Sequence, residues 1–233
     1  MARLALIDRG RGLAIAMMVV FHGCYDSTYF GFTHFDMLGS PFWTTWRTLI
    51  VTLFVFLSGI SLTLGRQAAP SRVRLRLVKL GASALLVSAV TAVLFGARWI
   101  YFGVLHFYFL ATLITRRWLG FPKLLGLAGI LLLGVGQLGW TSMDPRWLNW
   151  IGLAADKPAT EDYAPLLPWL GVLWIGVWMG NHPLLHSLSK QAKPPGHLGD
   201  RALQGMGRHG LLIYLIHQPI LFGLFTALRA LQG

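Results

Sequence analysis

Seven apolar runs, each close to the length of a membrane-spanning helix, constrain the fold of this chain more than any other feature. A helix needs about 20 predominantly apolar residues to cross a bilayer. Charged residues make up 12% of the chain, against about 25% in typical soluble proteins. The sequence therefore predicts an all-α, polytopic membrane helix bundle that forms a single domain over residues 1–233. The predicted spans are residues 11–30, 43–65, 76–96, 99–115, 121–140, 165–181 and 208–230.

Basic residues are distributed unevenly between the loops that join these runs. Fifteen of the 20 lysines and arginines fall in one set of loops, and cytoplasmic loops are enriched in these residues. We therefore expect a cytoplasmic N-terminus and, after an odd number of spans, a C-terminus outside. The clustering in short loops also argues against nucleic-acid binding as the reason for the net charge of +12. The larger set is Arg3, Arg9, Arg11, Arg66, Arg72, Arg74, Arg76, Lys79, Arg116, Arg117, Lys123, Lys190, Lys193, Arg201 and Arg208.

The first predicted span carries ionisable residues near both ends. Arg11 and His22 are eleven positions apart, which places them about 20° apart on one helix face with about 16 Å of rise between them. Asp26 follows His22 at i+4 and shares this face, and Asp8 lies within about 40° of it. Ionisable residues inside a membrane generally face the bundle interior or a water-filled cavity. We therefore expect a polar lane along one side of this helix.

Two interpretations of His22 are open from the sequence. A buried neutral imidazole can accept a proton, and a carboxylate such as Asp26 can fix its tautomer, as in a catalytic dyad. Alternatively, His22 forms a hydrogen bond to a neighbouring helix, and Asp26 caps the outer end of its own helix. His34 lies just beyond this span among aromatic residues, and it belongs either to an interfacial aromatic belt or to the site.

Three further polar positions lie inside the other predicted spans. Ser58 and Gly59, in "FVFLSGISL", mark a bend or a place of close helix packing. His106 lies near the centre of the fourth span. His217 lies midway along the seventh, two residues before Pro219, which opens a kink in the helix. For each histidine, a structural hydrogen bond and a direct chemical role are both open. No pair of histidines has a dedicated metal-ligand spacing, so we expect no metal.

Four segments together resemble a known family. "IDRGRGLAIAMMVVFH", "FVFLSGISL", "YFGVLHFYFLA" and "GRHGLLIYLIHQPIL" are similar to the transmembrane acyltransferases related to heparan-α-glucosaminide N-acetyltransferase. They look closest to the short bacterial branch, which implies a multi-pass protein of the bacterial cytoplasmic (inner) membrane. The ten residues between Arg11 and His22 also resemble the spacing in the first helix of the wider acyltransferase-three family.

The resemblance implies transfer of an acyl group, with acetyl-CoA or another acyl-CoA as the cytosolic donor. The implied acceptor is a glycan or a lipid-linked sugar on the far side of the membrane. Arg11 and Arg9 would bind the coenzyme end, and His22 would be the catalytic histidine, with Asp26 beside it. In the heparan enzyme, however, the catalytic histidine falls in the aromatic outer segment, where His34 is nearest in this sequence. Candidates for lining the substrate tunnel are Ser58, His106 and His217. Besides the acceptor, the expected partner is membrane lipid, and a homodimer stays open.

Two other functions fit the same residues. A haem-bearing electron carrier would use His22, His106 and His217 as axial ligands. A proton-coupled transporter would use the intramembrane histidine and aspartate as a relay. Transporters often contain inverted repeats, and we find no internal repeat in this sequence, which weakens the second alternative.

Overall fold

The structure is a computed structural model that describes residues 5–191 and 196–232. The described part of the chain is all-helical, with one isolated bridge between Trp140 and Ala154 in place of any strand. The all-α prediction is therefore confirmed for these residues. Arg3 and Lys193, two members of the larger basic set, lie outside the described residues, and so does the side chain of Lys190.

Each of the seven predicted spans overlaps a helix, although residues 99–103 of the fourth span and 136–140 of the fifth are not helical. These helices are α1 (Ala5–Tyr29), α2 (Pro41–Leu64), α3 (Pro70–Phe95), α4 (Val104–Arg116), α5 (Pro122–Val135), α7 (Leu166–Gly180) and α10 (Gly210–Ala230). Proline opens α2, α3 and α5, because its fixed φ suits the first helical position and its missing N–H is not needed there. The shorter or more polar helices are α6 (Arg146–Asn149), α8 (Pro183–Gln191) and α9 (Leu198–Arg208), with 3-10 turns at Gly96–Arg98 and Thr141–Met143.

Three of these helices are long and apolar enough to cross a membrane, namely α2, α10, and α3 together with the turn that follows it. α4, α5 and α7 are shorter apolar helices, and α1 is long but polar near both ends. Large apolar side chains lie on the surface: Leu85 is 71% exposed, Val93 85% and Ile220 60%. Exposed large apolar side chains on helices of this length and hydropathy suit lipid surroundings, so this is a membrane protein. The seven-span count and the orientation stay predictions.

The described residues divide into two compact units, and the division falls inside α2 between Leu57 and Ser58. One unit is Ser58–Leu185, and the other contains α1, the first part of α2, α9 and α10. The single domain over residues 1–233 stays a prediction.

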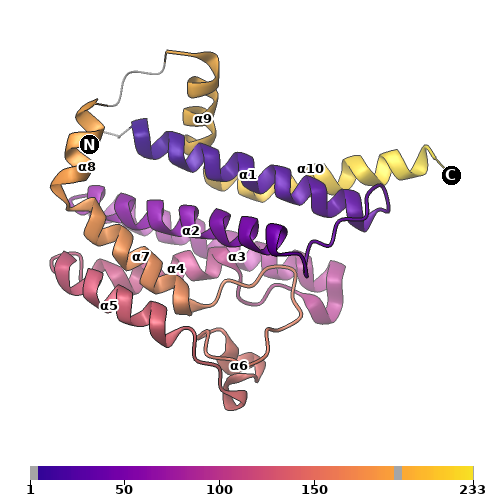
Figure 1. Ribbon diagram of the computed structural model, residues 1–233, viewed down its shortest axis with the longest axis horizontal. Coiled ribbons are helices and arrows are strands. Elements are labelled where there is room, and N and C mark those ends of the chain that lie inside the picture. Colours follow the sequence, from indigo (N-terminus) through magenta and orange to yellow (C-terminus); the bar gives the residue numbers. More distant parts are fainter. Residues whose placement is uncertain (1–4, 192–195, 233) are drawn as a thin grey trace. The chain divides into compact units, whose positions relative to one another are not determined.

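In the unit Ser58–Leu185, glycines bring helix backbones into contact. α5 and α7 run side by side (Figure 1), and a Cβ added to Gly129 would lie 2.7 Å from the carbonyl oxygen of Gly171. A Cβ on Gly59 would overlap the carbonyl oxygen of Leu173 on α7. Small residues permit such close approach of apolar helices without large side chains between them. Of the bend or close packing predicted at Ser58 and Gly59, close packing is therefore confirmed at Gly59.

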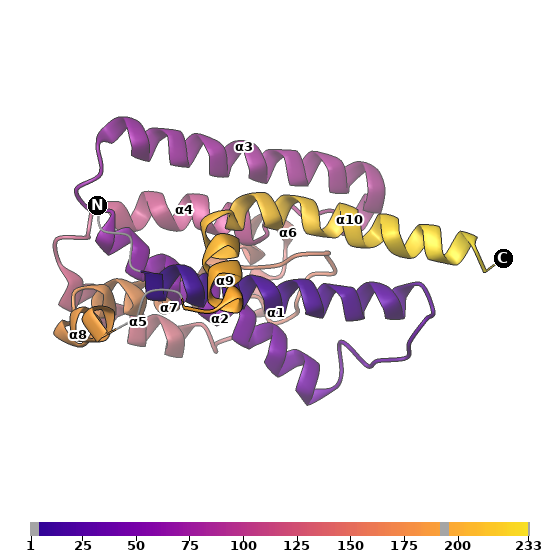
Figure 2. The ribbon, with the colours of Figure 1, turned by 90° about the horizontal axis from the view of Figure 1, so that it is seen from above.

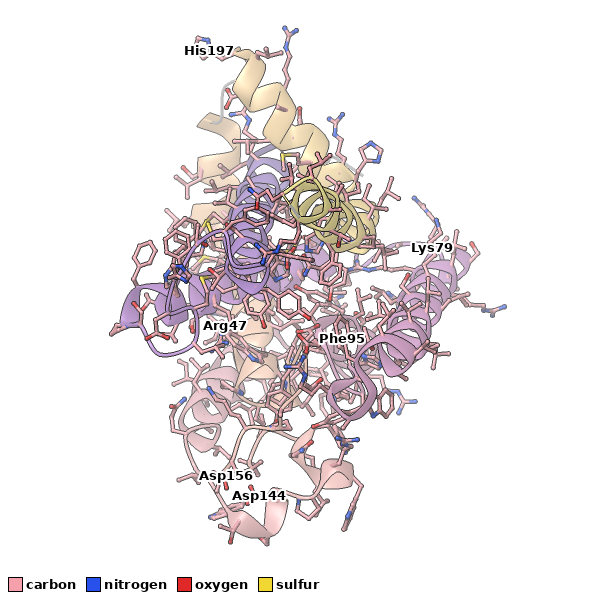
Figure 3. All side chains as sticks on the ribbon, turned by 90° about the vertical axis from the view of Figure 1, so that its right-hand side faces the viewer. Arg47, Lys79, Phe95, Asp144, Asp156 and His197 are labelled. Atoms are coloured by element: carbon pink, nitrogen blue, oxygen red, sulfur yellow. The ribbon has the colours of Figure 1, made fainter. Side chains whose placement is uncertain are left out.

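The segment between α5 and α7 is held by hydrogen bonds around Asn149, which is 2% exposed. Tyr163 donates its hydroxyl hydrogen to the Asn149 carbonyl oxygen at 2.6 Å, and Tyr101 donates to the Asn149 Oδ1 at 2.8 Å. Burial raises the pKa of Tyr163 to about 12, so this donor keeps its hydrogen at neutral pH. Farther along the segment the Asp156 N–H donates to Asp144, and Figure 3 shows these two residues close together.

In the other unit, α1 has close neighbours on two sides. α10 runs beside it (Figures 1 and 2), and α9 packs against its first half. The contact with α9 is backbone to backbone, since a Cβ on Gly12 would overlap the carbonyl oxygen of Leu203 and one on Gly207 that of Asp8. A cluster of Met18, Phe21, Met37 and Ile50 joins the middle of α1 to α2 and the loop before it. These contacts fix the side chains of α1 that carry the candidate site.

Candidate functional site

His22 and His217 meet where α1 and α10 lie side by side. His22 Nδ1 is 2.6 Å from His217 Nε2, and the two rings are nearly parallel, at 15°, with centroids 4.9 Å apart. His217 is 6% exposed and His22 is half-buried. We call these two residues the histidine pair. Two of the three intramembrane histidines of the sequence therefore share one site.

The separation of the two rings indicates a hydrogen bond between them. Two nitrogens bound to one metal ion lie about 4 Å apart when they are on opposite sides of it, because each metal–nitrogen bond is about 2 Å long. The 2.6 Å between His22 Nδ1 and His217 Nε2 is too short for that arrangement and suits a strong hydrogen bond. The geometry of this pair therefore favours proton chemistry over ligation of a haem iron between the two rings.

Asp26 lies one turn beyond His22 on α1 but forms its hydrogen bond with α10. Its Oδ1 accepts from Gln218 Nε2 at 3.3 Å, and the residue is 1% exposed. Asp26 Oδ2 and Gln218 Oε1 are buried and find no hydrogen-bond partner in the described part of the chain. Among the described residues, the partner of His22 is thus His217, rather than the aspartate that the sequence favoured.

His34 occupies the exposed loop that follows α1 and forms no hydrogen bond among the described residues. Beside it in sequence is a shallow, open pocket of about 240 Å³. Tyr25, Thr28 and Tyr29 of the last turns of α1 line one side, and residues Phe35, Asp36, Met37 and Leu38 line the other. The pocket is mainly aromatic and apolar with one carboxylate, and it is smaller and more open than most sites for small organic ligands.

Arg9 and Arg11 belong to a charged cluster at the start of α1. Arg11 Nη1 donates to Asp8 Oδ1 at 2.8 Å, and Arg208 Nε lies 3.8 Å from the other oxygen of the same carboxylate. Arg9 Nη1 lies 3.8 Å from Asp200 Oδ2 of α9. Asp8 is 3% exposed. Three guanidinium groups and two carboxylates leave one positive charge in excess in this arginine cluster.

His106, in the unit Ser58–Leu185, has both ring nitrogens engaged. The Gly103 N–H donates to His106 Nδ1 at 3.2 Å, at the start of α4. The Ser88 hydroxyl donates its single hydrogen to the Ile100 carbonyl at 2.6 Å, so it can only accept from His106 Nε2, 3.1 Å away. No ring nitrogen of His106 is left for a substrate.

Ser58 is half-buried at the point where α2 enters the same unit. Its neighbour Gly59 carries the contact with α7, and the Ser58 hydroxyl has no hydrogen bond among the described residues. A tunnel that joins Ser58 or His106 to the histidine pair stays a prediction.

Sequence reasoning missed three members of these clusters. Gln218, Asp200 and Arg208 were not selected as site residues, and His217 was selected without its partner. Gln218 follows His217 in α10, and Arg208 follows Gly207 in α9. The spacing of neither residue in the sequence indicates a functional site. Their role depends on which helices pack together, and a single sequence carries no local signal for that.

The fold and the site define a class: a membrane protein, all-helical in its described residues, with two hydrogen-bonded histidines between α1 and α10 that suit proton transfer. A comparison with protein families matches residues 3–219 to the family described as heparan-alpha-glucosaminide N-acetyltransferase, catalytic. The chain belongs to this family of membrane acetyltransferases, and the resemblance of the four segments is confirmed. Neither the curated proteins nor the solved structures give a significant match.

Proposed function

We propose that the chain is a membrane-bound acyltransferase that takes an acyl group, in the simplest case acetyl, from cytosolic acyl-CoA. It transfers this group to a hydroxyl or amino group of a sugar or glycan at the outer face of the bacterial cytoplasmic membrane. The observation that carries the proposal is the family match over residues 3–219. This range includes α1, α9 and the part of α10 that holds His217.

The chemistry needs a base and little else, because a thioester is already activated. His22 takes the proton from the acceptor hydroxyl or amine while the acceptor oxygen or nitrogen forms a bond with the thioester carbonyl carbon. The carbon–sulfur bond breaks, and the departing thiolate takes the proton from the His22 imidazolium. A positioned base of this kind contributes about 10²–10⁴ in rate, and holding both reactants in one site adds proximity and orientation.

The donor end of the site is the arginine cluster. Guanidinium groups bind phosphate oxygens in a bidentate manner, and coenzyme A carries several such groups. Asp8 and Asp200 hold the guanidinium groups of Arg11 and Arg9 in place, and the excess positive charge suits an anionic ligand. Arg208 also lies close to Asp8, and it is a third candidate for binding the donor beside Arg9 and Arg11.

The acceptor end is the pocket between the last turns of α1 and residues 35–38. His34 precedes this pocket directly, so it is the second candidate for the base or for a contact with the acceptor. Burial distinguishes the two histidines: His22 is half-buried and hydrogen-bonded to His217, whereas His34 is exposed in a loop. Exclusion of water from the reacting groups favours catalysis, and this supports His22 over His34 as the base.

The test is transfer by the purified protein in liposomes with radiolabelled acetyl-CoA, followed by mass analysis of the labelled lipids and glycans. We expect His22→Ala to abolish transfer while the variant still elutes as a folded protein. His34→Ala is the matched variant, and we expect it to keep part of the activity. Full activity of His22→Ala would remove His22 from the mechanism, and loss in His34→Ala alone would give the role to His34.

A further inference from the structure

The hydrogen-bond partners of His217 determine where its hydrogen lies. His217 Nδ1 is 2.7 Å from the Tyr214 carbonyl oxygen and 3.2 Å from that of Ile213, both in its own helix. A carbonyl oxygen only accepts, so Nδ1 must carry a hydrogen. A neutral imidazole carries a single N–H, and its other nitrogen is an acceptor. His217 Nε2 therefore presents a lone pair to its neighbour.

The neighbour of that lone pair is His22 Nδ1, 2.6 Å away. Two bare nitrogens at this distance would repel each other, so His22 Nδ1 carries the hydrogen and donates it to His217 Nε2. Neutral His22 then has its lone pair on Nε2. The hydrogen bonds run from His22 through His217 to the Tyr214 carbonyl oxygen. Within residues 5–191 and 196–232 they leave one ring nitrogen of the pair, His22 Nε2, free to accept a proton.

We propose that His217 is a positioning residue, which holds His22 in the tautomer with hydrogen on Nδ1 so that Nε2 is the basic atom. The inference rests on the proposed function, in which His22 is the base. When His22 Nε2 takes a proton, its Nδ1–H becomes a charge-assisted donor to His217 Nε2, and such bonds are about twice as strong as neutral ones. The imidazolium is thereby stabilised where it forms.

An imidazole suits this task inside a membrane better than the aspartate of a hydrolase triad. A carboxylate must be kept ionised to orient a histidine, and a charge in the hydrocarbon region is costly. His217 does the same work while it is neutral, because its own helix carbonyls hold its hydrogen on Nδ1. Asp26, the carboxylate within one turn, is bonded to Gln218 instead.

The first test reads the tautomer directly and needs no substrate. The full chain, with ¹⁵N-labelled histidine rings, is placed in lipid nanodiscs, and the His22 signals are assigned by comparison with His22→Gln. We expect Nδ1 of His22 to carry the hydrogen and Nε2 to be bare. In His217→Phe, which removes the acceptor, we expect both tautomers to be populated. Hydrogen on Nε2 of His22 in the native protein would overturn the inference, even if His217→Phe does not fold.

The second test separates positioning from structural support by kinetics. We expect His217→Phe to lower kcat by about 10² or more, the range for loss of a positioned base, with little change in KM for acyl-CoA. His217→Gln offers an amide oxygen to His22 Nδ1, and we expect it to recover most of this loss. Leu212→Ala, on the lipid-exposed side of the same helix, is the control and should match the wild type.

These two tests keep the inference distinct from the proposed function. If the tautomer changes in His217→Phe while the wild type has no transferase activity, the positioning role stands and the proposed function fails. If His217→Gln and His217→Phe lose activity equally while the tautomer of His22 is unchanged, His217 is structural, and the inference fails.

Discussion

His22 and His106 both lie within apolar helices, yet their ring nitrogens are used differently. His106 accepts from the Gly103 backbone and donates to Ser88, so it completes the start of α4. His22 donates to His217, and its second ring nitrogen has no hydrogen bond within the part of the chain that the structure describes. Buried polar groups are generally hydrogen-bonded. Of the two histidines, His22 is therefore the stronger candidate for a chemical role. The difference lies in the partners, since the residue type is the same.

His106→Ala tests the structural role at the residue scale. The substitution removes two hydrogen bonds and leaves the Gly103 N–H without its acceptor, which costs about 1–3 kcal/mol of unfolding free energy. We expect a lower melting temperature in detergent, with kcat unchanged at temperatures where the variant is folded. His197→Ala is the control, because His197 is exposed and makes no side-chain cap (Figure 3). A His106→Ala variant with the native melting temperature but without transferase activity would show that His106 takes part in the chemistry.

At the scale of helices, glycine determines which elements approach closely. α1 and α9 touch through Gly12 and Gly207, and α5 and α7 touch through Gly129 and Gly171. α5 and α7 are apolar helices, and in an apolar solvent no hydrophobic force presses such helices together, so close packing of their backbones is a main source of association. The contact with α9 also brings Asp200 and Arg208 to the start of α1.

Alanine at Gly12 or Gly207 tests this packing at the element scale. In each case the added Cβ would overlap a backbone carbonyl oxygen of the facing helix, which cannot move aside as a side chain can. Overpacking costs about 1–3 kcal/mol and occasionally more, so we expect both variants to melt at clearly lower temperature. Gly23→Ala, on α1 with open space around its Cβ, is the matched control. At Gly23, helix propensity favours alanine over glycine by about 1 kcal/mol, so this variant should melt no lower than the native protein. Equal melting temperatures of all three variants would contradict the contact between α1 and α9.

At the scale of the whole molecule, the asymmetry of basic residues predicts the orientation in the membrane. The chain has one cysteine, Cys24, so a Cys24→Ala background permits labelling at chosen sites. We expect an impermeant maleimide to label Lys157→Cys and Arg229→Cys on intact cells. Arg117→Cys, in the larger basic set, should react only after the cells are opened. The reverse pattern would show that the N-terminus is outside.

Much of this protein follows from local patterns in its sequence. Hydropathy and helix length predicted the seven longer helices, because a segment in lipid must satisfy its backbone hydrogen bonds internally and a helix does so. They did not predict α8 and α9, which lie in the polar stretch between the last two predicted spans. The angular relation of Arg11, His22 and Asp26 also followed, since one helix has a fixed rotation per residue. The close packing at Gly59 belongs to the same class of local signal.

The partners of these residues were decided by tertiary structure alone. His22 and His217 are 195 positions apart in the sequence, and Asp26 could have bonded to His22 or to another helix with equal local justification. Which side chains meet depends on which helices lie side by side and at what rotation, and backbone contacts between distant helices set both. The sequence by itself therefore determined the helices and the polar face of α1, and packing decided that this face meets a second imidazole instead of a carboxylate.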